Sequence, residues 1–304
     1  MAKKWDVLAL GVTAVDDLLI VPAFPAADYK TQVSFSTRQC GGLSATALVA
    51  AARLGATCAY AGTLGEDALS RFVEEALARE AIDLNYLVRR EDASPVHATI
   101  IVDSATGTRN IFFELKGFAG ADELQPDEEI ICAARVLFVD PYGIEGMVRA
   151  AKIARENNIP IVADIERLNA PRFGELLELV DHLIVSESFA LALTKQSTPF
   201  AAAQALWTKK RKVVIVTCGE NGCWALSDEN KAPQLFPAFA VEVKDTTGCG
   251  DVFHGAYAAA LAKELDLQTR IQEASAAAAM KATQHGGQAG IPTRAQLEEF
   301  LGRH

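Results

Sequence analysis

The stretch Val243–Leu261 reads VKDTTGCGDVFHGAYAAAL and joins a glycine-rich turn to a helix of small apolar residues. Gly248 and Gly250 can adopt backbone conformations closed to other residues, and they carry no Cβ that would keep a ligand away from the amides. A helix that begins here leaves free N–H groups and the positive end of its dipole at the turn. We therefore expect the amides of Gly248, Cys249 and Gly250 to hold an anion, such as a phosphoryl group in transfer.

Asp251 follows this turn in the first turn of the expected helix. A carboxylate is stabilised there by the same field and can accept a proton from a hydroxyl nucleophile. The stretch thus offers a general base and an anion hole, the two parts that phosphoryl transfer requires. An ordinary helix start, with Asp and Thr as caps and Gly255 for close helix packing, is the alternative. The chain has no G-x-x-x-x-G-K-[ST] motif, and the glycine spacing here does not match the dinucleotide fingerprint.

Composition places the chain among globular proteins. It has 304 residues, of which 50% are apolar and 22% charged, so a large core is possible. A net charge of −10 argues against nucleic acid or an anionic membrane as the main partner, because both require clustered Lys and Arg. Six cysteines without a Cys-x-x-Cys pair are typical of reduced thiols in a cytoplasmic protein. No signal peptide or membrane span is expected.

Short β-rich runs alternate with helical patterns through most of the chain. Strands are expected at WDVLALG (5–11), CAYAG (58–62), VLFVD (136–140), IPIVAD (159–164), HLIVS (182–186) and KVVIVT (212–217). Helices are expected from about Ser44, Asp67 and Ile144, after Glu187, and over Val252–Leu265 and Leu267–Gln284. Continuous apolar runs indicate strands buried on both faces, so the pattern predicts a parallel sheet flanked by helices.

Two segments break this alternation. Residues 16–36 contain the strand-like runs DDLLIVPAFP and TQVSFS, and residues 96–115 read as a hairpin that turns at 104–108. We expect lid strands from about 17–36 and 96–115 to form a small second sheet over one edge of the main sheet. The chain shows no linker or internal repeat, so residues 1–304 are expected to form a single catalytic domain.

Four stretches resemble the signatures of one family. DTTGCGDVFHGAYAAAL (245–261) resembles the D-T-x-G-A-G-D signature of ribokinase-like (PfkB) carbohydrate kinases, with Cys249 in place of the common alanine. The Gly-Gly signature is matched from Gly41, the nucleotide strand and turn from Val216, and the closing loop from His285. These matches occur in the family's order over nearly the whole chain. The resemblance implies an α/β fold, a ribokinase-like three-layer sandwich with a mostly parallel central sheet and a small β lid.

The resemblance also implies an activity, the ATP-dependent phosphorylation of a hydroxyl of a small sugar. Asp251 would be the general base, and the amides of residues 248–250 the anion hole. Asp245 and Thr247 match positions that hold a monovalent cation beside the anion hole in many family members, with the loop 285–290 completing the cage, which makes potassium a candidate cofactor. Turn capping explains Asp245 almost as well.

The nucleotide and its metal have candidate residues of their own. Thr217, Gly219 and Gly222 match the family's nucleotide-contacting turn, and Gly286 of the closing loop is assigned to the cofactor as well; a tight turn without a ligand is the alternative. Magnesium is implied as the partner of ATP. The family's Asn-x-x-Glu motif is replaced by VSESFA, so Glu187 is the remaining candidate metal ligand.

Six residues are the candidates for binding the sugar: Asp16, Gly41, Gly42, Thr46, Lys30 and Arg109. Phe113 and Tyr142 are further candidates on the lid side, where each could instead be a packing residue. Thr46 and Ala14 stand where ribokinases carry asparagines, which argues against ribose. The hairpin, VSES and GGQAGIP look more like the ketohexokinase and sulfofructose kinase branch, which predicts a ketose.

Two other functions remain open at this stage. A nucleoside kinase shares the fold, although adenosine kinases usually have a larger apolar lid. A catalytically weak sensor that binds sugar or nucleotide is suggested by the altered Asn-x-x-Glu motif, while the intact Asp251 opposes it. Because the edges of a β lid tend to be paired or covered, a homodimer joined lid to lid is expected.

Overall fold

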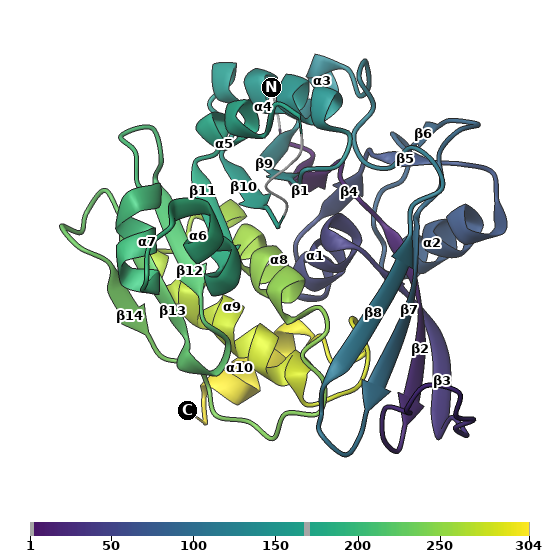
Figure 1. The fold of residues 1–304 in the computed structure, drawn as a ribbon. Coiled ribbons are helices and arrows are strands. Elements are labelled where there is room, and N and C mark those ends of the chain that lie inside the picture. The colour runs from purple at the N-terminus through teal and green to yellow at the C-terminus, as the bar shows by residue number, and fades with distance from the viewer. Residues whose placement is uncertain (1–2, 167–170, 304) are drawn as a thin grey trace.

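The computed structural model describes residues 3–166 and 171–303, and within them the main sheet has eight strands (Figure 1). In spatial order they are β14 (Gln234–Phe236), β13 (Cys223–Ser227), β12 (Val213–Thr217), β11 (His182–Ser186), β10 (Ile161–Asp164), β9 (Ala134–Val139), β1 (Trp5–Ala9) and β4 (Cys58–Tyr60). The neighbours from β12 to β4 are parallel, as predicted. The strands β13 and β14, at one end of the sheet, run antiparallel to their neighbours and were not predicted.

Alternate residues of the central strands face opposite layers. In β9, Val136 and Phe138 belong to one core cluster, whereas Leu137 and Val139 belong to the other. A strand buried on both faces needs apolar residues at every position, which is why these strands read as continuous apolar runs. The sheet is therefore the middle layer of three.

Helices cover both faces. One layer consists of α1 (Leu43–Arg53), α2 (Ala68–Arg79), α8 (Cys249–Ala262), α9 (Leu267–Ala282) and α10 (Arg294–Leu301). The other consists of α3 (Glu128–Cys132), α4 (Ile144–Glu156), α5 (Phe173–Leu179), α6 (Glu187–Thr194) and α7 (Pro199–Leu206). In the described part of the chain, no helix is both long and apolar enough to cross a lipid bilayer.

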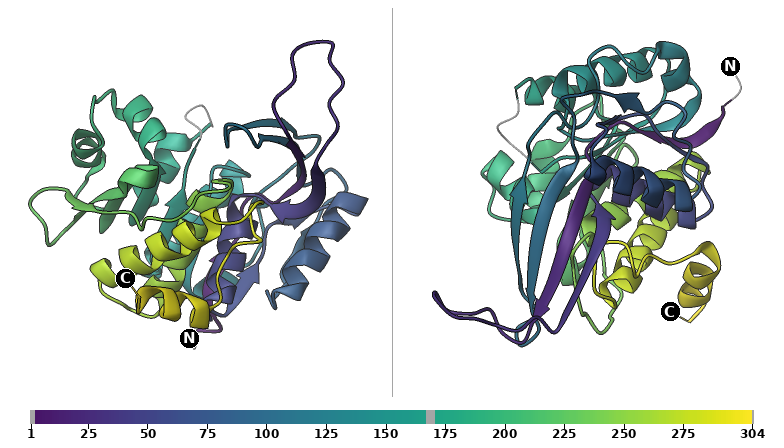
Figure 2. Two further views of the ribbon diagram at one scale, coloured as in Figure 1. Left: turned by 90° about the horizontal axis from the view of Figure 1, so that it is seen from below. Right: turned by 90° about the vertical axis from the view of Figure 1, so that its right-hand side faces the viewer.

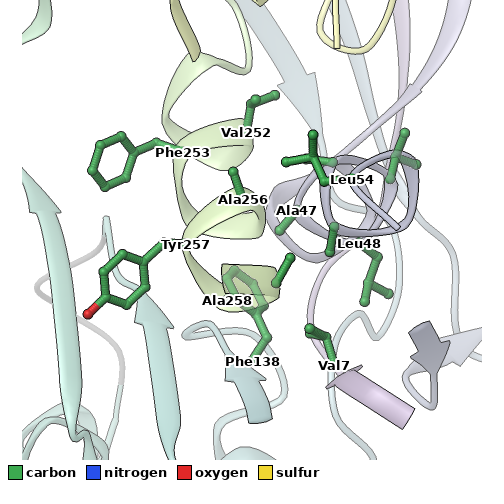
Figure 3. Packing of buried hydrophobic residues seen from close by; sticks show 14 of the residues in the cluster. Val7, Ala47, Leu48, Leu54, Phe138, Val252, Phe253, Ala256, Tyr257 and Ala258 are labelled. Carbon is green, nitrogen blue, oxygen red and sulfur yellow. The ribbon is translucent and has the colours of Figure 1, made fainter. Parts of the chain in front are cut away.

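Small residues let α8 lie close to α1 and the sheet (Figure 3). A Cβ on Gly255 would collide with the carbonyl group of Ala47 in α1, so only glycine permits this approach. Ala256 and Ala258 of α8 are fully buried beside it. This packing fixes the N-terminus of α8 at the carboxyl ends of the parallel strands, where α/β proteins commonly bind ligands.

The second sheet stands beside this body (Figure 2). Its spatial order is β3 (Phe35–Gly41), β2 (Ala14–Val21), β7 (Val96–Asp103) and β8 (Arg109–Glu114), with only the β2–β7 pair parallel in the described residues. The predicted lid from two insertions is thus present. A separate two-stranded pair is formed by β5 (Thr63–Leu64) and β6 (Val88–Arg89).

The bounds of the first insertion differ from those expected. Its strands extend beyond 17–36 at both ends, while residues 22–34 form a connection between them. Only Phe35 and Ser36 of the run TQVSFS lie in a strand. The pairing of Gly41 with Ala14 carries β3 up to the start of α1, and this pairing depends on contacts between distant segments.

Candidate active site

A cavity of about 450 Å³ lies between the lid sheet and the carboxyl ends of the parallel strands. Asp164, Ser186 and Thr217, the last residues of β10, β11 and β12, line it on one side. The lid contributes Ile111 and Phe113 of β8. The quoted glycine turn contributes Gly248, Gly250 and Asp251. The structure therefore brings the predicted base, the predicted anion hole and the lid to one cavity.

Asp245 shapes the turn before α8. Its Oδ1 accepts a hydrogen bond from the Thr247 amide at 2.8 Å, and its Oδ2 accepts one from the Gly286 amide at 2.8 Å. Gly248 has a φ of 76°, and a Cβ there would lie 2.8 Å from the carbonyl oxygen of Gly287. Asp245 thus ties the turn to the closing loop, and glycine is required where the two approach each other.

The three amides expected to form the anion hole are not equivalent. The Cys249 amide donates to the carbonyl oxygen of Thr246 at 3.3 Å, and Cys249 does not line the cavity. Within residues 3–166 and 171–303, the amides of Gly248 and Gly250 donate to no protein acceptor. Of the three amides expected to hold an anion, those of Gly248 and Gly250 are therefore the ones left free to do so. Burial raises the pKa of the Cys249 thiol, so a reactive thiolate is not favoured.

Asp251 belongs to a group of acidic residues. Burial raises its pKa well above the ordinary range, and the negative charges of Asp164 and Glu166 raise it further. Asp164, the last residue of β10, lines the same cavity as Asp251. The pKa of Asp164 is raised well above its ordinary value, by burial first and then by its acidic neighbours. A carboxylate with a raised pKa is a stronger base toward a hydroxyl proton.

His254 lies one helical turn after Asp251 in α8 and contacts Asp164, another member of the acidic group. Its Nδ1 is 2.8 Å from the carbonyl oxygen of Gly250 and 3.3 Å from Oδ2 of Asp164. Its Nε2 is 3.0 Å from the carbonyl oxygen of Ile184. Burial lowers the pKa of His254, while the two carbonyl oxygens raise it. Each ring nitrogen of His254 faces a carbonyl oxygen, which can only accept a hydrogen bond. Both nitrogens can donate at once only when the ring is protonated and charged, and the nearby carboxylate of Asp164 is then its counter-charge.

Asp16 lines the cavity from the lid side and is 8% exposed. Burial raises its pKa to about 7, with a further contribution from Asp17. A Cβ on Gly41 would collide with the Asp16 carboxylate, and one on Gly42, where φ is 92°, would lie 2.7 Å from the backbone of Thr13. The Gly-Gly pair thus gives the carboxylate and the start of α1 room beside the cavity.

Three other predicted residues of the sugar side line the cavity: Arg109, Phe113 and Tyr142. Nη1 of Arg109 donates to Oγ1 of Thr246 at 2.6 Å. The lid therefore contacts the turn that precedes α8.

Three candidates for sugar binding do not line the cavity: Gly41, Thr46 and Lys30. Thr46 is buried in α1, where its Oγ1 accepts a hydrogen bond from Nε2 of Gln288 at 3.3 Å. Lys30 is exposed on the 22–34 connection, which extends from the lid sheet (Figure 2). Thr46 is thus a packing residue that holds the closing loop, and Lys30 is not among the described residues that line the cavity.

Of the residues predicted to bind the nucleotide or its metal, only Thr217 is among the described residues that line the cavity. Thr217 lines the cavity, whereas Gly219 and Gly222 lie at the turn between β12 and β13, which includes the 3₁₀ turn η1 (Gly219–Asn221), outside it. A Cβ on Gly222 would collide with the carbonyl group of Phe236 in β14, so this glycine permits the pairing of the edge strands. The Gly286 amide is bound to Asp245 and is not free for a nucleotide. Glu187 is the first residue of α6 and does not line the cavity. It lies near Cys218, and its charge helps to raise the pKa of that thiol.

The sequence analysis missed Asp164, Glu166 and His254. A usable signal was present, because the runs VLFVD and IPIVAD both end in aspartate at the carboxyl edge of a parallel sheet. The two aspartates differ in role. Asp140 is fully buried and accepts hydrogen bonds from the amides of Val12 and Tyr142 and from Oγ of Ser44, at 2.7, 2.9 and 2.9 Å, so it joins strand ends and α1. Asp164 lines the cavity.

Residues 6–294 match the profile of the pfkB family carbohydrate kinases. The chain belongs to this family. It is 30% identical to a ribokinase of Bacillus subtilis over 272 residues, which cover 86% of this chain and 87% of that one. It is 29% identical over 273 residues to a ribokinase of Haemophilus influenzae, with the same coverage of the two chains. The fold is similar to a crystal structure of a putative ribokinase from Agrobacterium tumefaciens, with a TM-score of 0.90, 25% identity, and 98% and 97% of the two chains covered.

The protein is therefore a PfkB carbohydrate kinase with the ribokinase-like fold, as the motifs predicted. The narrower resemblance to the ketohexokinase and sulfofructose kinase branch is not confirmed by these relatives and stays a prediction. The roles of individual residues rest on the geometry described above.

Proposed function

We propose that this PfkB kinase transfers the γ-phosphoryl group of ATP to a hydroxyl of a small, uncharged sugar held between Asp16 and Asp251. The observation that carries the proposal is that Asp251 lines the same cavity as the unpaired amides of Gly248 and Gly250. Asp251 takes the proton of the sugar hydroxyl, which then attacks the phosphorus in line. The two amides stabilise the negative charge on the migrating group, as preorganised main-chain donors do in other transfer enzymes.

Magnesium is implied as the partner of ATP, and it neutralises phosphate charge when bound. In the described residues no group of three or more His, Cys, Asp or Glu is arranged to hold a metal. We therefore assign the ion to the phosphates, with Glu187 as the carboxylate that the sequence motif leaves for its water shell. The turn that contains Gly219 and Gly222 follows Thr217 at the cavity wall and is assigned to the nucleotide.

The charge of the cavity favours a neutral sugar. The acidic residues Asp16, Asp164, Glu166 and Asp251 line it, whereas Arg109 is the one Lys or Arg among its described lining residues. An anionic substrate would meet repulsion from these carboxylates. Carboxylates accept hydrogen bonds from sugar hydroxyls, and the rings of Phe113 and Tyr142 offer apolar faces to the C–H groups.

The choice between an aldose and a ketose follows from two opposed considerations. The names of the two relatives make ribose the first sugar to test. Ketoses are the second class of sugar to test, because Ala14 and Thr46 stand where ribokinases carry asparagines and so argue against ribose. Purified protein with Mg-ATP is expected to release ADP with at least one member of a panel of ribose, fructose, other ketoses and aldoses.

The same panel tests the other functions. Turnover with nucleosides alone would support the nucleoside kinase. Binding of sugar and ATP without ADP release above the basal rate would support the sensor and contradict our proposal.

We also infer a homodimer joined through the lid. Both edges of the lid sheet are exposed over much of their length, and Phe35 in β3 and Phe112 in β8 are 53% and 56% exposed. Exposed strand edges with apolar side chains favour pairing with another chain. Sedimentation is expected to show a dimer at micromolar concentration that Phe112→Glu weakens. A monomer in the unmodified protein would contradict this inference.

A further inference from the structure

Lys281 is a fully buried lysine beside the glycine turn. It lies in the last turn of α9 with 0% of its surface exposed. Its Nζ donates to the main-chain oxygen of Asp245 at 2.8 Å. The amides of Lys244 and Asp245 donate to the carbonyl oxygen of Ala282 at 2.8 and 3.2 Å. The amine therefore lies where the segment leading to Gly248 crosses the end of α9.

A buried ammonium group is costly unless nearby charges and dipoles compensate for the loss of water. Burial lowers the pKa of Lys281, and Arg109 acts in the same direction, whereas Cys249, Asp245 and Asp251 raise it. The carbonyl end of α9 also favours a cation in its last turn. On balance the pKa of Lys281 is lowered, and Cys249, Asp245 and Asp251 partly compensate for the cost of burying its charge, whereas most lysines in a last helical turn reach solvent.

The oxygens of Asp245 are already used. Oδ1 and Oδ2 accept the amides of Thr247 and Gly286, and the main-chain oxygen accepts Nζ of Lys281. Among the described residues, Oγ1 of Thr247 is a buried oxygen of this turn that has no hydrogen-bond partner. A potassium ion held by Asp245 would lie next to the ammonium group of Lys281 and would be repelled by its charge. The site predicted from Asp245 and Thr247 therefore does not fit a potassium ion.

We propose that the ammonium group of Lys281 is a built-in cation that takes the place of a monovalent metal ion beside the anion hole. The proposal rests on the proposed kinase function for its effect on turnover, but not for its effect on ion binding. The amine fixes the main chain at Asp245 and so the position of the Gly248 and Gly250 amides. It also places a positive charge on the protein side of the turn. Activity is then independent of potassium.

The first experiment measures ion binding without catalysis. Crystals of the unmodified protein are soaked in thallium(I), which substitutes for potassium and scatters anomalously. We expect no anomalous peak within coordination distance of the oxygens of Asp245 and Thr247. A peak there would overturn the proposal whether or not the protein shows kinase activity.

The second experiment compares turnover in potassium, sodium and tetramethylammonium chloride at equal ionic strength. The unmodified enzyme is expected to give the same kcat/KM in all three salts. A rise of about tenfold or more in potassium, the scale on which supporting groups of an active site act, would contradict a built-in cation. If no sugar is turned over at all, the proposed function fails, and the thallium experiment still decides the ion site.

The variant Lys281→Ala removes the ammonium group and leaves space beside the main-chain oxygen of Asp245. It is expected to lose activity by about tenfold or more in tetramethylammonium and to regain most of it in potassium. Loss of activity that no cation restores, in a variant that still folds, would contradict the proposal. If the variant does not fold, the unmodified enzyme's salt series and thallium result remain decisive.

Lys263→Ala is the matched control. Lys263 is the C-cap of α8, and its Nζ donates to the carbonyl oxygen of Leu54 at 3.1 Å, away from the turn. Its removal also deletes a lysine bond to a main-chain oxygen. We expect this variant to show no response to potassium, and an equal response in both variants would indicate a general effect of salt and overturn the proposal.

Discussion

Asp251 in the first turn of α8 and Asp164 at the end of β10 line the same cavity, and the negative charge of Asp164 raises the pKa of Asp251. Two acidic groups that interact this strongly do not titrate independently: Asp164 raises the pKa of Asp251, whereas the interaction with Asp251 lowers the pKa of Asp164. The pair, rather than a single residue, therefore sets the pH at which the proposed base is ready to accept a proton. Nδ1 of His254 lies 3.3 Å from Oδ2 of Asp164, and the charge of His254 lowers the pKa of Asp251.

Replacing Asp164 tests this pair through the pH profile. Asp251 must be ionised to act as a base, so activity falls as the pH drops through its raised pKa. Asp164→Asn removes one of the negative charges that raise this pKa. The acid limb of the kcat/KM profile is expected to move to lower pH than in the unmodified enzyme. An unchanged limb, measured with the sugar identified in the panel, would show that Asp164 does not control the titration of the base.

Replacing His254 is expected to move the acid limb of the kcat/KM profile to higher pH. The charge of His254 lowers the pKa of Asp251, so His254→Gln raises it and moves the acid limb to higher pH. The variant also loses buried hydrogen bonds, which cost about 1–3 kcal/mol when a partner is left unsatisfied. Thermal unfolding measures that loss separately. A large fall in stability with no movement of the limb would assign His254 a purely structural role.

Asp16 is predicted to make sugar binding depend on pH. Its pKa of about 7 means that the carboxylate form, which accepts hydrogen bonds from hydroxyls, becomes populated between about pH 6 and 8. The KM for the sugar is expected to fall over this interval, while the KM for ATP changes little. In Asp16→Asn the KM for the sugar should be higher and should no longer vary with pH. A pH-dependent KM that persists in this variant would exclude Asp16 as its cause.

The sequence predicts those features that depend on local patterns. The central strands are recognisable because burial on both faces requires an apolar residue at every position, as in Val213–Val216. The start of α8 is recognisable because its turn needs glycine at Gly248. The strands β13 and β14 were missed because both are short. The sequence of the turn 219–222, which joins β12 to β13, does not show whether an antiparallel strand follows it.

The site residues that were missed depend on contacts between distant segments. His254 is one residue of a helical pattern until the fold brings it to Ile184 and Asp164. Lys281 resembles an ordinary lysine at a helix end, and only the crossing of the 244–248 segment buries it. Thr46 and Gly286 were placed by their positions in motifs and Lys30 by its position in the expected lid, and the structure gives the Thr46 and Lys30 side chains and the Gly286 amide other surroundings.

The most direct measurement concerns Asp251 itself. Sugar phosphate formation is followed in a single turnover for the unmodified enzyme and for Asp251→Asn, with the dissociation constants of ATP and sugar measured on both. Removal of a general base is expected to slow the phosphoryl transfer step by about 10²-fold or more while both ligands still bind. Transfer at the unmodified rate by the Asn variant would contradict the assignment of Asp251 as the base.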